Sequence, residues 1–284
     1  MSELVAAGLG CLEARWGPAV TVERVEVDLG ERAVFRARAS DGTRVVVKVD
    51  SVGQRFRRER LALQAAAAGG VRVPRIVLAR AGTPNVLVLE EVSGTPLSSR
   101  SPSTAWVRTG VQLRRLHGLP PPEGLDRFDH REGSWPEFML WWADQTRSEA
   151  VAMGWLQGTT AGIVHERMRA RLERMGEPER RLLHGDCTPA HVLTDAGTDD
   201  VSALIDFGDA GTGDPAWDLV VLTLWCPERL VAVLEGYGPS RGLAEHVEVV
   251  GPAYRILRHL AAAGWLAEHG FDPAADLEMA SRIS

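Results

Sequence analysis

The residues best suited to chemistry surround a short predicted β-hairpin in the C-terminal half of the chain. Val192–Asp195 and Val201–Ile205 are expected to be its two strands, because a run of small and polar turn-forming residues separates them. If the strands pair antiparallel, His191 and Asp206 face each other at the open end, since cross-strand neighbours have Cβ atoms ~5 Å apart. Asp186 returns to the same end through one short loop. Two carboxylates and an imidazole are therefore expected to converge on one bound ion.

This convergence suits phosphoryl transfer. One carboxylate can orient an attacking hydroxyl and accept its proton, while other ligands hold the Mg²⁺ that neutralises charge on the phosphates. The spacing is that of a kinase catalytic loop: His184-Gly-Asp186, a ligand five residues later at His191, and Asp-Phe-Gly beginning at Asp206. Any one of these aspartates alone is better explained as a helix cap or a solvated turn residue. The joint spacing with His184 favours the chemical role.

A single lysine fits the same chemistry. Of the 32 basic residues only Lys48 is a lysine, which marks a position where a compact point charge is needed. It lies in the apolar run Val45–Val49, where an unpaired cation would be costly. On the next helical segment Glu59 is the one charge on the apolar stripe, so it should face inward. We expect a buried Lys48–Glu59 pair that positions nucleotide phosphates; a purely structural ion pair is the alternative.

The elements that must position these residues fall into two groups, residues 1–91 and 92–284. In the first group the pattern predicts helices over Glu3–Trp16 and Gly53–Ala68, and strands over Val20–Val27, Ala33–Ala39, Arg44–Asp50, Ile76–Ala79 and Val86–Leu89. Five strands with one inserted helix make a compact lobe. We expect this lobe to bind the nucleotide.

Residues 92–284 are expected to form a larger, mainly helical lobe that carries the catalytic residues and the acceptor. A helix should begin at Ser101-Pro102 and end at His117. The other predicted helical segments are Trp135 to Trp155, Thr160–Met175, and those beginning near Asp214, Pro227, Gly242 and Asp272. The fold class is thus α+β and bilobal, with a five-stranded antiparallel sheet and one helix in the N-terminal lobe.

From about Gly30 to Leu222 the chain resembles the aminoglycoside phosphotransferase family, which are small-molecule kinases of the protein-kinase-like fold. The matching elements are Gly30–Arg38, Lys48, Glu59, the hinge-like Val86–Gly94, Leu113–His117, the His184–Asp186 loop, the Asp206 motif and Gly213–Leu219. The His-Val-Leu at His191 and the later Ile-Asp-Phe-Gly-Asp-Ala are similar to the 2''-kinases of this family.

The resemblance implies roles for the residues of the catalytic loop. Asp186 would be the catalytic base, and His191 with Asp206 would hold Mg²⁺. Asp218 would be the buried aspartate that braces the loop, with His184 as a further structural support. Asn is usual at the position of His191, and imidazole is a poorer ligand than an amide oxygen for hard Mg²⁺. A pseudokinase is therefore an alternative, although active 2''-kinases and macrolide kinases resemble this chain in having His there.

The resemblance also implies a nucleotide site for ATP or GTP. Backbone groups of Glu90 and Val92 would bind the purine, and Lys48 with Glu59 would position the phosphates. The predicted phosphate-covering loop has a single glycine, Gly30, in place of a G-x-G-x-x-G pattern. By itself that loop would not indicate a nucleotide site.

The acceptor site is the least determined part. Acidic residues could hold the amino groups of an acceptor, and tryptophans could stack on a sugar face. The acidic candidates are Glu132, Glu137, Asp144, Glu149, Glu228 and Glu235. The tryptophan candidates are Trp135, Trp141, Trp142 and Trp265. Such residues are more often solvated helix surface or core. Glu137, Trp142 and Glu228 are the candidates that we carry forward for a small, cationic or sugar-containing acceptor.

Composition and charge narrow the classes of function. With 45% hydrophobic and 25% charged residues among 284, the chain has the balance of a globular protein. The longest mainly apolar run, Leu219–Cys226, is far short of the ~20 residues that span a bilayer, so no membrane partner is expected. Residues 92–284 hold 18 Lys and Arg against 27 Asp and Glu, which argues against nucleic acid. This acidity is compatible with a cationic acceptor, and equally with simple solubility.

These observations lead to one expected function with two alternatives. Three scattered cysteines without a CxxC pattern, and no recognisable signal sequence, favour the cytoplasm; Cys187 has no evident role. Residues 208–214 leave no room for the activation segment of a protein kinase. We expect a kinase that moves the γ-phosphoryl group of ATP or GTP to a hydroxyl of a small molecule, with an antibiotic such as an aminoglycoside as the leading acceptor. A metabolic kinase for a sugar, amino alcohol or amino acid, and a nucleotide-binding pseudokinase, are the alternatives.

Overall fold

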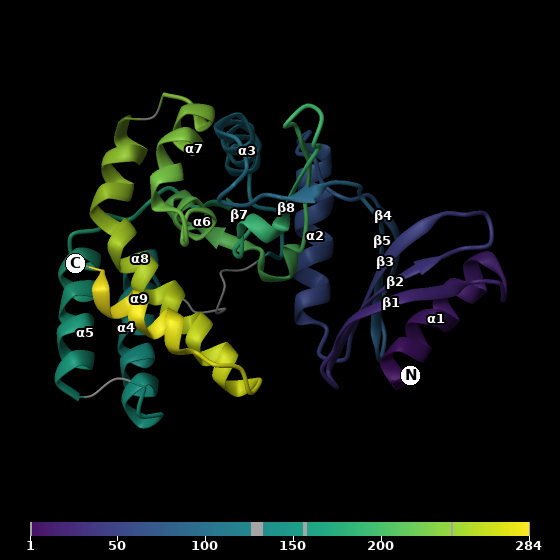
Figure 1. Cartoon of the computed structure of the whole chain (residues 1–284), viewed down its shortest axis with the longest axis horizontal. Coiled ribbons are helices and arrows are strands. Elements are labelled where there is room, and N and C mark those ends of the chain that lie inside the picture. Colours follow the sequence, from purple (N-terminus) through teal and green to yellow (C-terminus); the bar gives the residue numbers. More distant parts are fainter. Residues whose placement is uncertain (1, 126–132, 156–157, 240, 284) are drawn as a thin grey trace.

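A computed structural model describes residues 2–125, 133–155, 158–239 and 241–283. Figure 1 shows two bodies, a sheet with one covering helix at the N-terminal end and a helical body at the C-terminal end, with helix α2 between them. The N-terminal elements are α1 (Glu3–Trp16), β1 (Thr21–Asp28), β2 (Arg32–Arg38), β3 (Arg44–Asp50), α2 (Gln54–Ala68), β4 (Ile76–Arg80) and β5 (Asn85–Glu90). The sheet has the order β1-β2-β3-β5-β4, and every neighbouring pair is antiparallel.

Alternation along β3 decides where Lys48 points. Val45, Val47 and Val49 are fully buried in a cluster with α1, which covers one face of the sheet. Side chains alternate between the two faces of a strand, so Lys48 lies on the opposite face, toward α2 and the helical lobe. Helix α2 turns its apolar residues, Phe56 and Leu63 among them, into the core cluster of the helical lobe.

The C-terminal lobe is built mainly from helices around one core. The helices are α3 (Ser103–His117), α4 (Trp135–Ala152), α5 (Gly158–Leu172), α6 (Pro215–Leu222), α7 (Leu230–Tyr237), α8 (Arg241–Glu268) and α9 (Ala274–Arg282). Five short strands accompany them: β6 (Thr95–Pro96), β7 (Arg181–Leu183), β8 (Val192–Thr194), β9 (Val201–Leu204) and β10 (Gly211–Gly213). Strands β6, β8 and β9 form one small sheet, and β7 pairs with β10.

The predicted α+β fold with its five-stranded antiparallel sheet is confirmed, and two local details differ from expectation. Strand β8 pairs with β9 so that Val192 faces Leu204, one residue out of the predicted register, with an irregularity after Leu193. His191 and Asp206 are therefore not cross-strand partners. His191 ends a 3₁₀ turn, and Asp206 has a left-handed backbone (φ 63°) that starts another, so both lie just beyond the strand ends.

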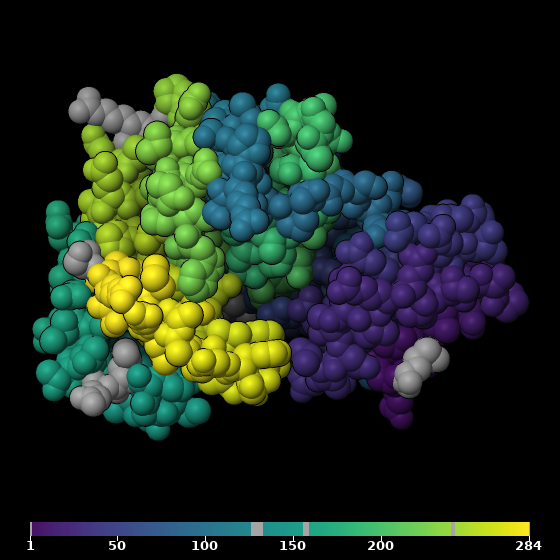
Figure 2. Space-filling view, in the orientation of Figure 1, coloured from purple at the N-terminus to yellow at the C-terminus, as the bar shows by residue number. Residues whose placement is uncertain are grey.

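The two lobes meet along a hollow. Figure 2 shows the yellow C-terminal segment reaching the flank of the purple N-terminal lobe, with the surface hollowed between them. No helix in the part of the chain that the structure describes is long and apolar enough to cross a membrane.

Candidate active site

The N-terminal lobe contributes Lys48 to the cleft, and Arg32 Nη2 of β2 also lies 3.4 Å from Asp206 Oδ1. Lys48 Nζ lies 2.5 Å from Glu59 Oε1 of α2 and 2.8 Å from Asp206 Oδ1 of the other lobe. Burial alone would lower the pKa of Lys48, but the charges of Asp206 and Glu59 outweigh burial and raise it. The same ammonium holds the pKa of the partly buried Asp206 carboxyl well below its usual range. The predicted Lys48–Glu59 pair is thus present, and it connects the lobes through Asp206.

Buried hydrogen bonds fix the backbone of the catalytic loop. Gly185 has a left-handed backbone (φ 87°), which a residue with a side chain would adopt only with strain. The buried Asp218 of α6 accepts hydrogen bonds from the His184 amide (2.7 Å) and the Gly185 amide (2.9 Å). His184 is fully buried, its ring packs at a tilt against Phe207, and its Nε2 lies 2.8 Å from the Ile205 carbonyl oxygen; burial lowers the pKa of His184. The loop that carries Asp186 is therefore held from behind.

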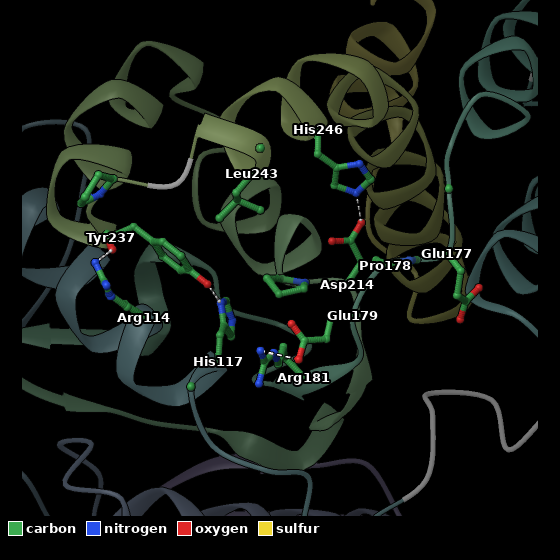
Figure 3. Close-up of a pocket in the computed structure, with 15 residues that line it drawn as sticks. Arg114, His117, Glu177, Pro178, Glu179, Arg181, Asp214, Tyr237, Leu243 and His246 are labelled. Atoms are coloured by element: carbon green, nitrogen blue, oxygen red, sulfur yellow. Dashed lines mark hydrogen bonds and ion pairs between the residues drawn. The ribbon is translucent and has the colours of Figure 1, made fainter.

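A chain of hydrogen bonds connects Asp218 to the back of the helical lobe. His117 Nε2 lies 3.0 Å from Asp218, and because a carboxylate only accepts hydrogen bonds, this nitrogen is the donor. His117 Nδ1 then accepts from the Tyr237 hydroxyl at 3.0 Å. Burial raises the pKa of Tyr237 to about 12, so the hydroxyl keeps its proton. Figure 3 shows this pair on the wall of a cavity of about 610 Å³ behind the loop, here called the rear cavity.

Asp214 lies on another wall of the rear cavity and has a structural role. Its Oδ1 caps α6 by accepting from the Ala216 amide (2.9 Å), at the point where the sequence predicts that a helix begins. Its Oδ2 bonds the Tyr254 hydroxyl and His246 Nε2, both at 2.6 Å; the contact with His246 is visible in Figure 3. Hydrogen bonding to this carboxylate raises the pKa of His246.

Asp186 is held at one oxygen by a residue that the sequence analysis missed. Arg258 Nη2 of α8 donates to Asp186 Oδ1 at 2.6 Å. Asp186 Oδ2 lies 3.6 Å from His191 Nδ1, beyond hydrogen-bond distance. Burial would raise the pKa of Asp186, but the positive charge of Arg258 and its hydrogen bond lower it overall. The carboxylate is therefore ionised at neutral pH, with Oδ2 available to a substrate hydroxyl.

His191 and Asp206 have the donor atoms for a divalent cation. His191 Nδ1 lies 2.7 Å from the Asp186 carbonyl oxygen and must donate to it, which leaves a lone pair on Nε2. That Nε2 faces Asp206 Oδ2 at 3.8 Å, too far for a hydrogen bond. Among the described residues no three His, Cys, Asp or Glu side chains form a complete metal cage. Mg²⁺ needs none, because it binds one or two protein ligands and completes its shell with phosphate oxygens and water.

A pocket of about 220 Å³ under the sheet, here called the hinge cavity, ends at Lys48, His191 and Asp206. The apolar side chains on its walls are Val34, Val46, Pro74, Leu89, Val92, Leu193 and Ile205. The Glu90 amide already donates to the Arg75 carbonyl at 2.9 Å, so only the carbonyl of Glu90 can reach a ligand there. Gly30 lies at the tip of the β1–β2 turn (φ 77°) and does not line this cavity.

A third pocket, which like the rear cavity has a volume of about 610 Å³, opens in front of Asp186 and is here called the α8 cavity. It is lined by Arg32, Arg55, Arg58, Trp142, Gly185, Asp186, His191, Asp206, Asp209, Trp217, Arg258, Ala261, Ala262, Trp265 and Leu266. Trp142 and Trp265, both named from the sequence, lie there. The sequence signal for Arg258 is its helical spacing from Trp265, seven residues on, which places both residues on one face of a helix.

The acidic residues named for the acceptor do not line the α8 cavity. Glu137 caps its own helix by accepting from the Ser134 amide at 2.7 Å, and Glu228 lies in the 3₁₀ turn Pro227–Arg229, which does not line the cavity. Asp144 faces α5, with His165 Nε2 at 2.6 Å. Glu149 and Glu235 are also absent from the lining, and Glu132 lies outside the described residues. Helix packing, which composition does not reveal, turned these carboxylates away.

Cys187 follows Asp186 in the chain but is fully buried. Burial raises the pKa of its thiol well above the usual value, so it is not a nucleophile.

Comparison with known proteins agrees with this geometry. A model of the phosphotransferase enzyme family matches residues 21–260, and a search of curated proteins finds no match. Among solved structures, an aminoglycoside-3'-phosphotransferase of type VIII is 26% identical, with a TM-score of 0.62 over 91% of this chain and 100% of that one. A 2''-phosphotransferase in complex with GDP and kanamycin is 19% identical, with a TM-score of 0.73 over 95% and 96%.

An apo APH(4)-Ia phosphotransferase is likewise 19% identical, with a TM-score of 0.70 over 96% of each chain. These likenesses establish the bilobal, kinase-like fold. With the family model covering most of its length, the chain belongs to the phosphotransferase enzyme family and is a small-molecule kinase.

Proposed function

We propose that this enzyme transfers the γ-phosphoryl group of ATP or GTP, as its Mg²⁺ complex, to a hydroxyl of a small molecule, and that the acceptor is an antibiotic. One observation carries the proposal: Lys48 of one lobe and Asp206 of the other are in contact at 2.8 Å, beside Asp186 and His191. The similar structures support a nucleotide and a small acceptor, since one is a complex with GDP and kanamycin and another a ternary complex with ADP and hygromycin B.

The nucleotide would occupy the hinge cavity. Its purine would lie between the apolar walls near the Glu90 carbonyl and Val92, with the phosphates at the end where Lys48 lies. Lys48, oriented by Glu59, would hold the phosphates, and the β1–β2 turn at Gly30 would close over them. His191 and Asp206 would hold the Mg²⁺, which supplies charge neutralisation at the transferred group.

The acceptor would enter the α8 cavity and present its hydroxyl to Asp186. Because Arg258 holds Oδ1, Oδ2 is the atom that would accept the hydroxyl proton and orient the oxygen for in-line attack. The low pKa of Asp186 makes orientation its main contribution, which suits a loose transition state in which the nucleophile is deprotonated late. Asp218 and His184 would keep the loop in place during turnover.

A screen of ADP or GDP formation tests this function. Purified enzyme would be incubated with ATP or GTP and a panel of aminoglycosides, macrolides, peptide antibiotics, amino sugars and choline-like alcohols. We expect acceptor-dependent turnover that Asp186→Asn abolishes. His191→Asn should retain turnover with a changed preference between Mg²⁺ and Mn²⁺.

The alternatives give different results in the same screen. Turnover that is fastest with a sugar, amino alcohol or amino acid would identify a metabolic kinase. Nucleotide binding without transfer to any acceptor would favour a pseudokinase, and equal activity of the two variants would refute the role of Asp186.

A further inference from the structure

The charges around the α8 cavity bear on which acceptor the enzyme selects; the inference rests on the function proposed above. Three aspartates line the cavity, and each is paired with a basic side chain. Asp186 is 2.6 Å from Arg258, Asp206 is 2.8 Å from Lys48, and the third, Asp209, is 3.0 Å from an arginine of α2. The carboxylates that a cationic acceptor would need are thus already neutralised within the protein.

The wall that an acceptor would face comes mainly from one stripe of α8. Its lining residues are Arg258, Ala261, Ala262, Trp265 and Leu266, spaced at i, i+3, i+4, i+7 and i+8, which places them on one face of the helix. Trp265 is half exposed, so its ring is accessible. This stripe is apolar and aromatic apart from one charge, the guanidinium next to the base.

Trp142 of α4 and Trp217 of α6 complete the apolar part of the lining. No glutamate lines the cavity among the described residues. The extra acidic residues of 92–284 therefore lie away from this cavity. The α8 cavity offers no unpaired carboxylate to hold a cationic acceptor, contrary to the expectation from the sequence.

A polycation would bind poorly here for two physical reasons. Each ammonium group that leaves water without a carboxylate partner pays a desolvation penalty. A positive charge near the reacting hydroxyl would also lie close to Arg258, and like charges in a partly buried site repel. An apolar ring face, by contrast, gains by covering Trp265 and Trp142.

We propose that the acceptor is a hydroxyl compound with a broad apolar or aromatic face and no net positive charge, and that Arg258 is the residue that selects against cations. One N–H of the Arg258 guanidinium bonds Asp186, and its other donors suit a carbonyl or carboxylate oxygen beside the reacting hydroxyl. Arg258 thus has two roles, which are to position the base and to discriminate acceptors by charge.

The test compares two ligands that share rings and hydroxyls and differ in charge: kanamycin and its fully N-acetylated, neutral derivative. Dissociation constants would be measured by calorimetry with a non-hydrolysable ATP analogue and Mg²⁺ present, so binding is read without turnover. The variants are Arg258→Gln and Arg258→Glu, and Arg282→Glu on α9 is the control, because it makes the same charge change at an exposed position. Thermal unfolding would check that each variant is folded.

We expect the wild-type enzyme to bind the neutral derivative at least about tenfold more tightly than kanamycin. Arg258→Glu should tighten kanamycin binding by about tenfold or more, with Arg258→Gln intermediate and Arg282→Glu unchanged. The inference would be overturned if the wild type bound kanamycin more tightly than the N-acetylated derivative. It would also be overturned if the affinity for kanamycin did not change with the charge at position 258. Failure of the proposed function is a separate result, the absence of transfer to any acceptor while nucleotide still binds.

Discussion

Replacing Asp218 by Asn tests whether a buried carboxylate braces the catalytic loop. In the native protein Asp218 Oδ2 accepts from the His184 amide and from His117 Nε2, and Oδ1 accepts from the Gly185 amide. An asparagine side chain has nearly the same shape but only one accepting oxygen. If that oxygen takes the position of Oδ2, the new NH₂ group faces the Gly185 N–H, and two donors oppose each other in a buried site.

The size of the effect follows from these contacts. One hydrogen bond to a charged group is lost, worth about 1.5–3 kcal/mol, and a buried donor without a partner costs about 1–3 kcal/mol more. We expect the free energy of unfolding to fall by roughly 3–5 kcal/mol, a large share of the total stability of a typical protein. At about 2–4 °C per kcal/mol, the melting temperature should drop by on the order of 10 °C. A loop displaced by about 1 Å would also lower kcat by roughly 10²-fold.

Chemical denaturation and steady-state kinetics measure both effects. Asp144→Asn is a matched control, because this carboxylate is half exposed and its partners among the described residues are two side chains of α5, His165 and Arg169. It should change the free energy of unfolding by no more than about 1 kcal/mol. If Asp218→Asn unfolded like this control and kept the wild-type kcat, the bracing role would be refuted.

Three further predictions follow from other contacts. Lys48→Met should lower kcat/KM for the nucleotide by about 10²–10³-fold with an unchanged far-UV spectrum, whereas a change below threefold would mean that the lysine is only structural. Gly236→Ala should lower the free energy of unfolding by about 1–3 kcal/mol, because its new Cβ would lie 1.7 Å from the Val107 carbonyl oxygen. This clash lies where α3 meets α7, and an unchanged melting temperature would contradict that packing. Hydrogen bonding to Asp214 raises the pKa of His246, so its stabilisation is complete below its unfolded pKa and is lost as pH rises through the folded pKa. His246→Gln should therefore destabilise more at pH 5.5 than at pH 8.5, and an equal loss at both pH values would show that the contact does not depend on charge.

Sequence reasoning found the elements whose patterns are local and strong. The bounds of α1 and β3 match the predicted Glu3–Trp16 and Arg44–Asp50, because periodicity and turn residues mark their ends. The unusual lysine count pointed to Lys48, and its contacts with Glu59 and Asp206 agree with that inference.

The parts that were missed depend on contacts between distant segments. Strands β6, β7 and β10 have only two or three residues, too few for a periodic signal, and they exist because a partner strand pairs with them. The register of the β8–β9 hairpin was wrong by one residue because the loop between the strands sets it, with a left-handed backbone at Asp199 (φ 58°) and an irregularity after Leu193 that the residue pattern does not show.

The contact between Arg258 and Asp186 joins residues 72 positions apart, and no local sequence pattern at either residue indicates it. The acidic residues expected at the acceptor site were identified by composition alone. Composition does not say which face of a helix is buried, and packing turned Glu137 and Asp144 elsewhere.

The direct test of the central claim is a pulsed electron paramagnetic resonance measurement on the enzyme with Mn²⁺ and a non-hydrolysable ATP analogue. If the metal–nucleotide complex binds between Lys48 and the facing His191 and Asp206, the Mn²⁺ signal should carry a ¹⁴N coupling from the imidazole. That coupling should disappear in His191→Asn while the nucleotide remains bound. A wild-type spectrum without nitrogen coupling, or one that the substitution leaves unchanged, would contradict the account.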